Sequence, residues 1–377
     1  MQRLITLFLL CSVTFVLSSQ TTAEEFVTDG IAKKDNTDCE GAIVKYNSAL
    51  AIEPLNFNAL YEKGWCLNEL QKYEEATKML EKSSGVEPES VKSTFELAYA
   101  YDHLNNFEKA IENYKKVLSL DPDYYEAIQN LAYLYYDSDE YENAYDYFVQ
   151  YVDSEPDPDN DAYYYAGWCA NELEKYADAV HYFRNYFPEE ARENAKKFSE
   201  IGFAWYKLEN AAEAEQAYNA ALSYESTYGA ALRGLGDTYY DLKEDRNMAL
   251  SYYEKAISND PDNSMYLYYD IGWIYNEMER YQDAINMLSK AIDYDEQDSY
   301  AYVELGYANY MLDYNDAALS ALKKAVEMNS ESVLGLYYLG LTYLNLSRKS
   351  DAMDVYYKLK PMDEEYADKL LQEINEN

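Results

Sequence analysis

Histidine is the residue type with the widest catalytic use, and the sequence holds two of them, His103 and His181. They lie far apart, and no Gly-x-Ser-x-Gly, His-Glu-x-x-His or phosphate-binding glycine loop accompanies either one. A general base must stand within hydrogen-bond reach of its partner, and no pairing of that kind can be read from the spacing. Lone histidines are typical of packing or surface positions. We therefore expect no catalytic residues and no enzymatic activity.

An acidic run from Asp157 to Asp161 has a composition that suggests a cation site. A calcium loop of the helix–loop–helix type needs glycine at its sixth place and a bidentate glutamate at its twelfth. The twelfth place here is Trp168, and the sixth is not glycine. The run is explained more simply as a turn. We expect neither a metal ion nor another cofactor.

The charge balance excludes two classes of partner. The 377 residues include 31 Lys and Arg against 70 Asp and Glu, which gives a formal net charge of −39. Nucleic acids and anionic membrane surfaces are both bound through Lys and Arg, so neither is an expected partner. Acidity of this size keeps an extended surface soluble, and it also attracts basic partners or divalent cations. The aromatic fraction of 16% argues against disorder.

The first 22 residues have the pattern of a secretory signal peptide. Arg3 precedes an apolar run from Leu4 to Leu17, and small or polar residues follow as far as Ala23. The run is shorter than the roughly 20 residues of a transmembrane helix. We expect export to the periplasm or secretion, with an uncleaved membrane anchor as the alternative. Two cleavage points remain open, one near Ser18 and one near Ala23.

Alanine recurs along the chain at intervals of 34 or 35 residues. A glycine or alanine precedes each of these alanines by twelve residues, or by thirteen in one copy. Between them, apolar residues recur at spacings of three and four, which is the helical period, and a short polar turn such as Gln71-Lys72 interrupts it once. The small residues let two antiparallel helices approach closely. The marker alanines are Ala42, Ala76, Ala110, Ala144, Ala179, Ala214, Ala249, Ala284, Ala318 and Ala352.

This pattern resembles the tetratricopeptide repeat, whose 34-residue unit has aromatic, Leu-Gly, Tyr, Ala and Pro residues at set offsets. One copy shows Leu97-Ala98, Tyr101, Ala110 and Pro122 at those places. The resemblance implies an all-α fold, a right-handed superhelical solenoid of antiparallel helix pairs. It covers residues 23–364 in ten repeats that start near 23, 57, 91, 125, 160, 195, 229, 265, 299 and 333.

Three local features complete the predicted architecture. Residues 365–377 form an amphipathic segment similar to the capping helix that such solenoids require. Pro188 predicts a shortened second helix in the fifth repeat, because proline cannot continue the helical hydrogen bonds. The seventh repeat gains one residue, which we place around 245–247.

A longer period lies over the short one. The segment Gly64-Trp65-Cys66-Leu67-Asn68 recurs as Gly167-Trp168-Cys169-Ala170-Asn171 and again as Gly272-Trp273-Ile274-Tyr275-Asn276. The copies are three repeats apart. One repeat followed by three duplicated blocks of three repeats explains this spacing.

The resemblance also implies that the residue after each small marker faces the concave groove. Seven of these ten residues are aromatic, and aromatic or amide side chains hold neighbouring places. The stripe is typical of a binding surface, although single rings at these places also pack helix against helix. The candidate partner-binding residues are Tyr61, Trp65, Asn68, Phe95, Tyr99, Tyr133, Tyr136, Tyr164, Trp168, Asn171, Phe203, Tyr206, Tyr240, Tyr269, Trp273, Asn276, Tyr307 and Tyr310.

The predicted function is that of a non-enzymatic, exported scaffold or adaptor that binds protein or peptide segments along the concave face. A glycan-binding module that uses the same aromatic trough is the alternative. Some family members grip a terminal carboxylate with several basic groove residues, and here Arg233 is the lone cation at the equivalent places. The sequence leaves the identity of the partner and the oligomeric state open.

Overall fold

The computed structural model of the chain describes residues 22–376, which fold into helices and turns without a strand. Apart from Thr22, the predicted signal peptide lies outside these residues. No helix within them is long and apolar enough to cross a membrane.

Most of the helices follow one another in pairs, a first helix and a second helix joined by a short turn. The pairs are α1 (Ala23–Lys34) with α2 (Cys39–Ile52), α3 (Phe57–Glu69) with α4 (Tyr73–Val86), α5 (Val91–His103) with α6 (Phe107–Leu120), α7 (Tyr125–Asp137) with α8 (Tyr141–Ser154), α9 (Asn160–Glu172) with α10 (Tyr176–Asn185), α11 (Ala191–Lys207) with α12 (Ala211–Tyr224), α13 (Gly229–Asp237) with α14 (Arg246–Asn259), α16 (Leu267–Glu277) with α17 (Tyr281–Tyr294), α18 (Ser299–Met311) with α19 (Asn315–Met328), and α20 (Val333–Asn345) with α21 (Lys349–Leu359).

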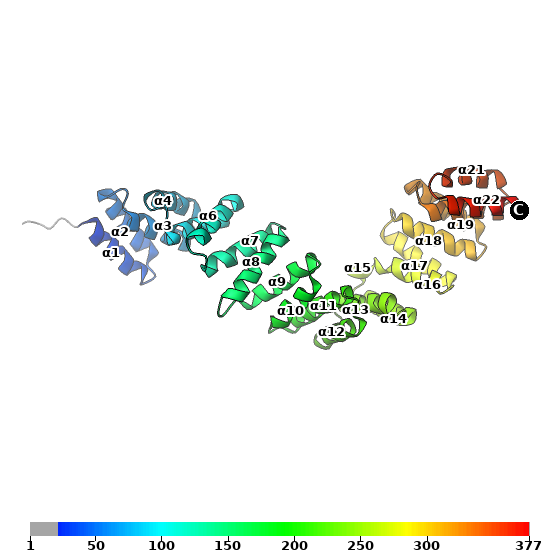
Figure 1. Cartoon of the computed structure of the whole chain (residues 1–377), viewed down its shortest axis with the longest axis horizontal. Helices are drawn as coiled ribbons and strands as arrows, with labels where there is room; N and C mark the ends of the chain where they lie inside the picture. The colour runs from blue at the N-terminus through cyan, green and yellow to red at the C-terminus, as the bar shows by residue number, and fades with distance from the viewer. Residues whose placement is uncertain (1–21, 377) are drawn as a thin grey trace, which may run out of the picture. The chain divides into compact units, whose positions relative to one another are not determined.

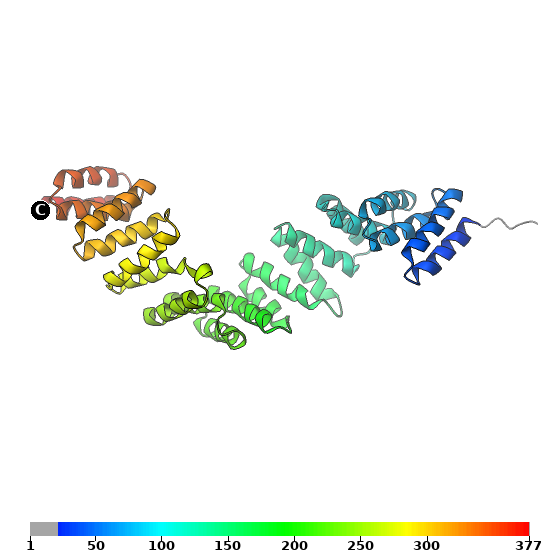
Figure 2. The same cartoon turned by 180° about the vertical axis from the view of Figure 1, so that it is seen from behind.

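The chain divides into two compact units, one up to Cys169 and one from Ala170 onward. Within each unit, the helices of a pair lie side by side and the next pair follows directly (Figure 1, Figure 2). The short helix α15 (Pro261–Ser264) lies between α14 and α16. Each unit buries its apolar residues between consecutive pairs, so its core runs along the stack.

In the pairs whose first helix has a glycine at the marker position, there is no room for a side chain between the helices, as two examples show. A Cβ atom on Gly64 would lie 2.5 Å from Cγ of Leu80, and one on Gly272 would lie 2.6 Å from Cγ of Leu288. The bulky partner comes from the second helix in both cases. The small side at each of these glycines is the space that a bulky residue of the second helix occupies, and we call this space a notch. It sets the distance between the two helices of the pair.

A residue with positive φ that is not glycine precedes the second helix of every pair, and outside the seventh pair the turn has the same form. In the second pair, the N–H of Lys72 donates to the carbonyl of Leu67 at 2.8 Å, and the N–H of Gln71 donates to the carbonyl of Asn68 at 2.8 Å. These two bonds form the Schellman motif, which satisfies the last carbonyls of a helix. The positive-φ residues are Thr37, Gln71, Asn105, Asp139, Glu174, Glu209, Glu244, Glu279, Asp313 and Ser347.

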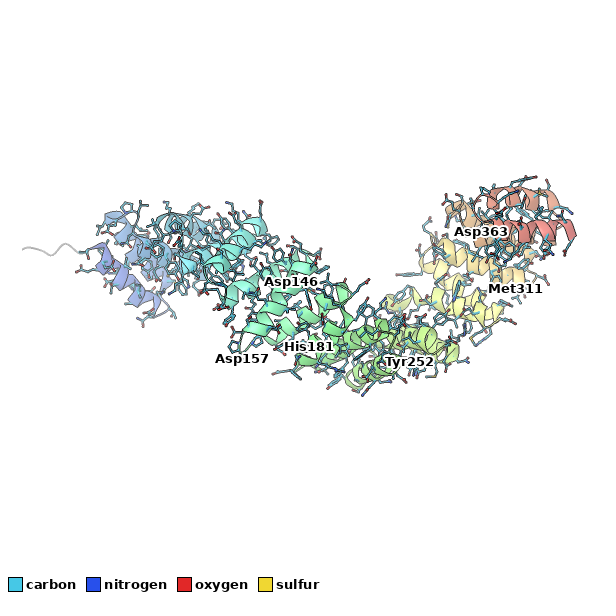
Figure 3. The ribbon with its side chains drawn as sticks, in the orientation of Figure 1. Asp146, Asp157, His181, Tyr252, Met311 and Asp363 are labelled. Carbon is cyan, nitrogen blue, oxygen red and sulfur yellow. The ribbon has the colours of Figure 1, made fainter. Side chains whose placement is uncertain are left out.

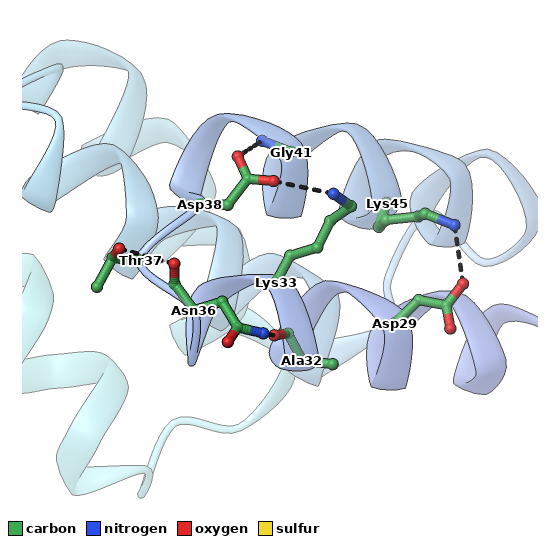
Figure 4. Close-up of polar contacts among 8 residues, drawn as sticks. All are labelled: Asp29, Ala32, Lys33, Asn36, Thr37, Asp38, Gly41 and Lys45. Atoms are coloured by element: carbon green, nitrogen blue, oxygen red, sulfur yellow. Dashed lines mark hydrogen bonds and ion pairs between the residues drawn. The ribbon is translucent and has the colours of Figure 1, made fainter.

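Polar side chains cap the start of four second helices, α2, α6, α12 and α14, and Figure 4 shows the first of these caps. Asp38 Oδ1 accepts a hydrogen bond from the N–H of Gly41 at 2.8 Å, which caps α2, and Asp38 Oδ2 lies 2.9 Å from Lys33 Nζ. Lys45 Nζ reaches across the pair to Asp29 Oδ2 at 2.8 Å. The caps satisfy N–H groups that the helix itself leaves without partners.

The seventh pair takes up its extra residue in a π-helical turn, η1 (Thr238–Leu242), and not at 245–247 as the sequence suggested. The N–H of Lys243 donates to the carbonyl of Thr238, five residues earlier, at 3.2 Å. The predicted place was wrong because Asp245 caps α14 through the N–H of Met248. An insertion there would have broken the cap, whereas a π turn absorbs one residue inside the helix.

Two helix starts also differ from the predicted repeat starts, and both follow an irregular connection. Helix α10 ends at Asn185, shortly before Pro188, and α11 then begins at Ala191, four residues before the predicted start at 195. Helix α16 begins at Leu267, two residues after the predicted start at 265, because α15 precedes it.

The last helix, α22 (Glu364–Glu376), covers the end of the second unit. Its residues Ala367, Leu370 and Ile374 are fully buried. A Cβ atom on Gly340 would lie 2.5 Å from Leu370, so the closing helix fills the notch of the tenth pair. It covers apolar surface that a further pair would otherwise bury.

Candidate binding surface

The predicted aromatic residues lie on the first helices, apart from Tyr240 in η1, and nearly all of them are half-buried. Tyr164 is buried, as are Asn68, Asn171 and Asn276, while the other fourteen candidates are intermediate in exposure. A half-buried ring both packs against its neighbours and shows part of its face to solvent. The structure is therefore compatible with both roles that the sequence left open for these rings.

In the first unit, rings from neighbouring first helices touch each other. The ring centroids of Tyr136 on α7 and Trp168 on α9 are 5.3 Å apart, and those of Tyr133 and Tyr165 are 5.2 Å apart. Edge contacts of this kind are the favoured geometry for aromatic pairs. Tyr61 and Tyr99 instead contact Phe57 and Tyr73. The predicted stripe is thus a set of local ring groups.

In the second unit, Trp273 and Tyr240 are joined by a hydrogen bond. The indole Nε1 of Trp273 donates to the Tyr240 hydroxyl at 2.9 Å, and that hydroxyl donates to Glu277 at 2.9 Å. Tyr307 and Tyr310 both contact the ring of Tyr338, on the next first helix. Phe203 packs against Tyr176, and Tyr269 packs in the core around α16.

The three asparagines predicted as polar handles make contacts between consecutive pairs. Asn68 Nδ2 donates to Glu96 Oε2 at 2.8 Å, and Asn276 Nδ2 donates to Glu304 Oε2 at the same distance. Asn171 Nδ2 donates to Glu200 at 3.1 Å. The Oδ1 atom of each asparagine is buried and has no hydrogen-bond partner. In each of the three blocks, an asparagine amide thus holds a glutamate carboxylate of the next pair in place. The oxygen of the same asparagine side chain has no hydrogen-bond donor.

Sequence reasoning missed these glutamates. Each lies 28 or 29 residues after its asparagine, and that recurring spacing was the signal that could have found them. Burial raises the pKa of Glu96 to about 7, with Glu69 and Glu62 adding to the effect and Asn68 opposing it. Burial likewise raises the pKa of Glu304 and of Glu200.

Two pockets in the second unit share Trp273. The Asn276 pocket has a volume of about 180 Å³ and is lined by Trp273, Asn276, Glu277, Glu304, Tyr307 and Tyr338, among others. The Asp270 pocket has a volume of about 240 Å³, and its lining includes Tyr206, Asp237, Tyr240, Asp241, Asp270 and Trp273. Both combine aromatic faces with carboxylates, which is the chemistry that attracts a cation.

Burial and mutual repulsion shape the electrostatics of the Asp270 pocket. Burial raises the pKa of Asp270 to about 6, and the nearby carboxylates of Asp237 and Asp241 add to this effect. Burial also raises the pKa of Asp237, against a hydrogen bond from Tyr253 and the charge of Arg233. The carboxylates of Asp237, Asp241 and Asp270 thus lie close together, and the charge of Arg233 offsets their repulsion only in part.

The two histidines lie on different helices. His103 is exposed and contacts the rings of Tyr73 and Tyr99. His181 is exposed on α10 (Figure 3). Its ring centroid lies 5.1 Å from that of Tyr182. Over residues 22–376, no three His, Cys, Asp or Glu side chains are arranged to hold a metal ion.

Comparison with known sequences identifies the repeat. Profiles described as tetratricopeptide repeat match residues 57–90, 92–124, 130–191, 204–264, 266–298 and 313–367, well over half of the chain. The chain belongs to the tetratricopeptide repeat family. The resemblance seen in the sequence and the all-α fold of paired helices are both confirmed. No curated protein matches the chain.

Solved structures share the fold at low sequence identity. The C-terminal part of a tetratricopeptide repeat-containing protein from Cytophaga hutchinsonii is 20% identical, with a TM-score of 0.55 over 64% of this chain and 98% of that one. YrrB, described as a TPR protein with an unusual peptide-binding site, is 24% identical with a TM-score of 0.42 (48% and 93% covered). MamA from Desulfovibrio magneticus RS-1 is 19% identical, with a TM-score of 0.43 over 45% of this chain and 95% of that one.

Proposed function

We propose that this protein is a non-enzymatic adaptor that holds extended segments of partner proteins along the aromatic faces of its first helices. One observation carries the proposal. The three duplicated blocks, which contain Trp65, Trp168 and Trp273, each place a half-buried indole on the same helix as a buried asparagine oxygen without a partner. An extended peptide offers both apolar side chains and backbone N–H groups, so it suits such a surface.

The test replaces Trp65, Trp168 and Trp273 together by alanine. Cross-linking mass spectrometry in the native setting identifies partners of the unchanged protein, and we expect the triple variant to lose them while its helical circular-dichroism signal persists. A loss of the helical signal would show instead that the indoles hold the fold together.

The matched control removes three aromatic rings that lie outside the proposed surface. Tyr294, Tyr314 and Tyr357 are 53%, 51% and 66% exposed. Their simultaneous change to alanine removes a similar apolar area and should leave partner capture intact. Equal loss in the control and in the tryptophan variant would contradict a dedicated surface.

Glycan binding is the second candidate, because rings beside carboxylates also line the Asn276 and Asp270 pockets. Sugar rings stack on aromatic faces and bond to carboxylates. Binding on a glycan array, with no protein captured by cross-linking, would place this candidate first.

We further propose that the protein acts after export, as the pattern of residues 1–22 indicates. The mature protein should then lack this segment and be recovered outside the cytoplasm. N-terminal sequencing of the native protein tests both points, and an intact N-terminus in a membrane fraction would favour the uncleaved anchor.

A further inference from the structure

The first tryptophan block contains a cation site that the chain fills itself. Lys34 Nζ lies 4.9 Å from the ring centroid of Trp65 and 2.6 Å from Glu62 Oε2. The Lys34 and Glu62 side chains are 20% and 14% exposed, so the pair is largely covered. An ammonium is thus held between an indole face and a carboxylate, which is a favourable arrangement for a cation that has left water.

The third block keeps two of these three groups and loses the ammonium. Trp273 corresponds to Trp65, and Asp270 to Glu62, since each acid precedes its tryptophan by three residues. Lys34 follows the marker Gly30 by four residues, and Tyr240 follows Gly236 by four. Like Lys34, Tyr240 reaches the tryptophan of the next first helix, through the hydrogen bond from the indole. A neutral phenol therefore stands where the first block has its positive charge.

Ion pairs with arginine neutralise Asp237 and Glu277 in part, but they do not include Asp270, which corresponds to Glu62. Tyr206 donates to Asp241 at 2.5 Å and Tyr253 donates to Asp237 at 2.7 Å. Within residues 22–376 Asp270 has neither a side-chain hydrogen bond nor an ion pair. In this part of the chain, three cations lie nearby. They are Arg233, whose Nε lies 4.0 Å from Asp237, Lys207 on α11, and Arg246, whose Nε lies 3.1 Å from Glu277 and whose Cζ lies 6.0 Å from the ring centroid of Tyr240.

The neighbouring Asn276 pocket supplies a second, independent feature. Asn276 is 5% exposed, and its Oδ1 atom has no hydrogen-bond donor. A buried acceptor without a donor is costly, so a ligand that donates a hydrogen bond would satisfy it. Glu304, which is 8% exposed, lies in the same pocket with the Tyr307 and Tyr338 rings. Both sides of Trp273 therefore favour a ligand that is rich in donors and positively charged.

We propose that the two pockets beside Trp273 bind a basic segment of a partner protein, whose ammonium or guanidinium group takes the place that Lys34 has in the first block. This inference rests on the proposed adaptor function and names the chemistry of its partner. The cation lies against the indole and Asp270, and an N–H group of the same segment donates to Asn276 Oδ1. The formal charge of −39 draws such segments to the protein from a distance.

The experiment measures the binding of short peptides to the whole protein by fluorescence anisotropy at about 150 mM salt, where long-range attraction is largely screened. The probe is a labelled nine-residue peptide of alternating serine and lysine with blocked ends. Two matched peptides carry norleucine or glutamate in place of lysine. We expect the lysine peptide to bind at least about tenfold more tightly than either matched peptide, because close charge pairs in an interface couple strongly.

Two variants locate the site. In Asp237→Asn/Asp270→Asn we expect the lysine peptide to bind at least about tenfold more weakly. Tyr240→Lys rebuilds the self-filled arrangement of the first block, and we expect it to weaken peptide binding and raise the melting temperature. The charge-matched control, Asp316→Asn/Asp354→Asn, changes two exposed acids on α19 and α21 and should bind within twofold of the unchanged protein.

The outcomes separate this inference from the adaptor function. Equal weakening in the charge-matched control would assign binding to overall charge and overturn the site. Equally tight binding of the norleucine peptide would leave an apolar peptide surface but no cation site. If no peptide binds, the cation site is also overturned, while partner capture by cross-linking still decides the adaptor function.

Discussion

Asn276 donates its side-chain amide to the carboxylate of Glu304 at 2.8 Å, and this bond joins two consecutive helix pairs. The contact recurs between Asn68 and Glu96 and between Asn171 and Glu200. It holds a largely buried carboxylate in place, because the amide replaces one of the water contacts that the carboxylate loses. The same bond uses only one end of the amide, which leaves the oxygen for a ligand.

Removing that amide should destabilise the second unit. Asn276→Leu leaves Glu304 without its donor, and we expect a loss of about 1.5–3 kcal/mol in the free energy of unfolding. Urea denaturation measures it. Asn276→Leu/Glu304→Leu should recover most of the loss, because an apolar pair no longer strands a buried charge. If the double variant is as unstable as the sum of both single variants, the two residues do not act as a pair.

The notch at Gly64 should tolerate no side chain. Gly64→Val pushes into Leu80, and we expect a loss of about 3 kcal/mol by urea denaturation. Gly85, on the second helix of the same pair, has open space around it, because a Cβ atom there would meet nothing within 4 Å. Gly85→Ala should therefore stabilise by about 0.5–1 kcal/mol, because alanine favours the helix. Similar effects at both positions would contradict the notch.

The turn residues with positive φ should gain from glycine. Glu209 has a φ of 56°, where side chains with a Cβ atom are strained. Glu209→Gly should raise stability by about 0.5–1 kcal/mol, and Glu209→Val should lower it, because a β-branched residue fits this conformation worst. Thermal denaturation of both variants checks the order. An unchanged melting temperature in both would mean that the turn rearranges freely.

Glu96 should make the protein less stable as the pH rises. Its pKa is about 7 in the folded chain against an ordinary value of 4.5. Between these values the unfolded chain releases the proton while the folded chain keeps it. The contribution is therefore full below pH 4.5 and is lost as the pH rises towards 7, on the order of 2–3 kcal/mol.

The control for this pH effect is Glu96→Gln, which keeps the shape and removes the titration. Urea denaturation at about pH 5 and about pH 8, on either side of the folded pKa, should show a smaller difference for the variant than for the unchanged protein. Besides burial, the groups that act on the pKa of Glu96 are Asn68, Glu69, Glu62 and Lys34, and Tyr61, Tyr99, Tyr114 and Tyr124 also lie near the carboxyl. Equal pH dependence in both proteins would remove Glu96 as the source.

Salt should stabilise the chain. With 31 basic and 70 acidic residues, the helices repel one another electrostatically, and ions screen that repulsion. We expect the melting temperature to rise between about 10 and 300 mM sodium chloride and with millimolar divalent cations. A flat melting temperature would show that the charges are too dispersed to matter.

The repeat was predictable because its physics is local. Gly64 and Leu80 lie sixteen residues apart, and the same small and bulky residues recur in later copies such as Gly272 and Leu288. The place of the extra residue was not predictable, because a loop and a π turn add the same length to the chain. The hydrogen bond from the Lys243 N–H to the Thr238 carbonyl decides between them only in three dimensions.

The aromatic stripe was predictable as a set of positions but not as a surface. The residue types at Tyr240 and Trp273 can be read from the sequence, whereas the hydrogen bond between them appears only in the structure. The carboxylates around them, such as Asp270, do not stand out in the sequence because acidic residues are common there. Their significance depends on convergence from several helices, which the one-dimensional pattern does not record.

The contact between Leu370 and Gly340 has a consequence for assembly. Leu370 of α22 fills the space beside Gly340, whereas in other pairs a residue of the second helix, such as Leu80 beside Gly64, fills the corresponding space. Helix α22 therefore packs on the last pair in the way that a second helix packs on a first helix. A chain cut before Glu364 would present the open notch and its apolar surroundings to other molecules. Such chains could join end to end into filaments. We therefore expect α22 to prevent end-to-end association as well as to cover a core.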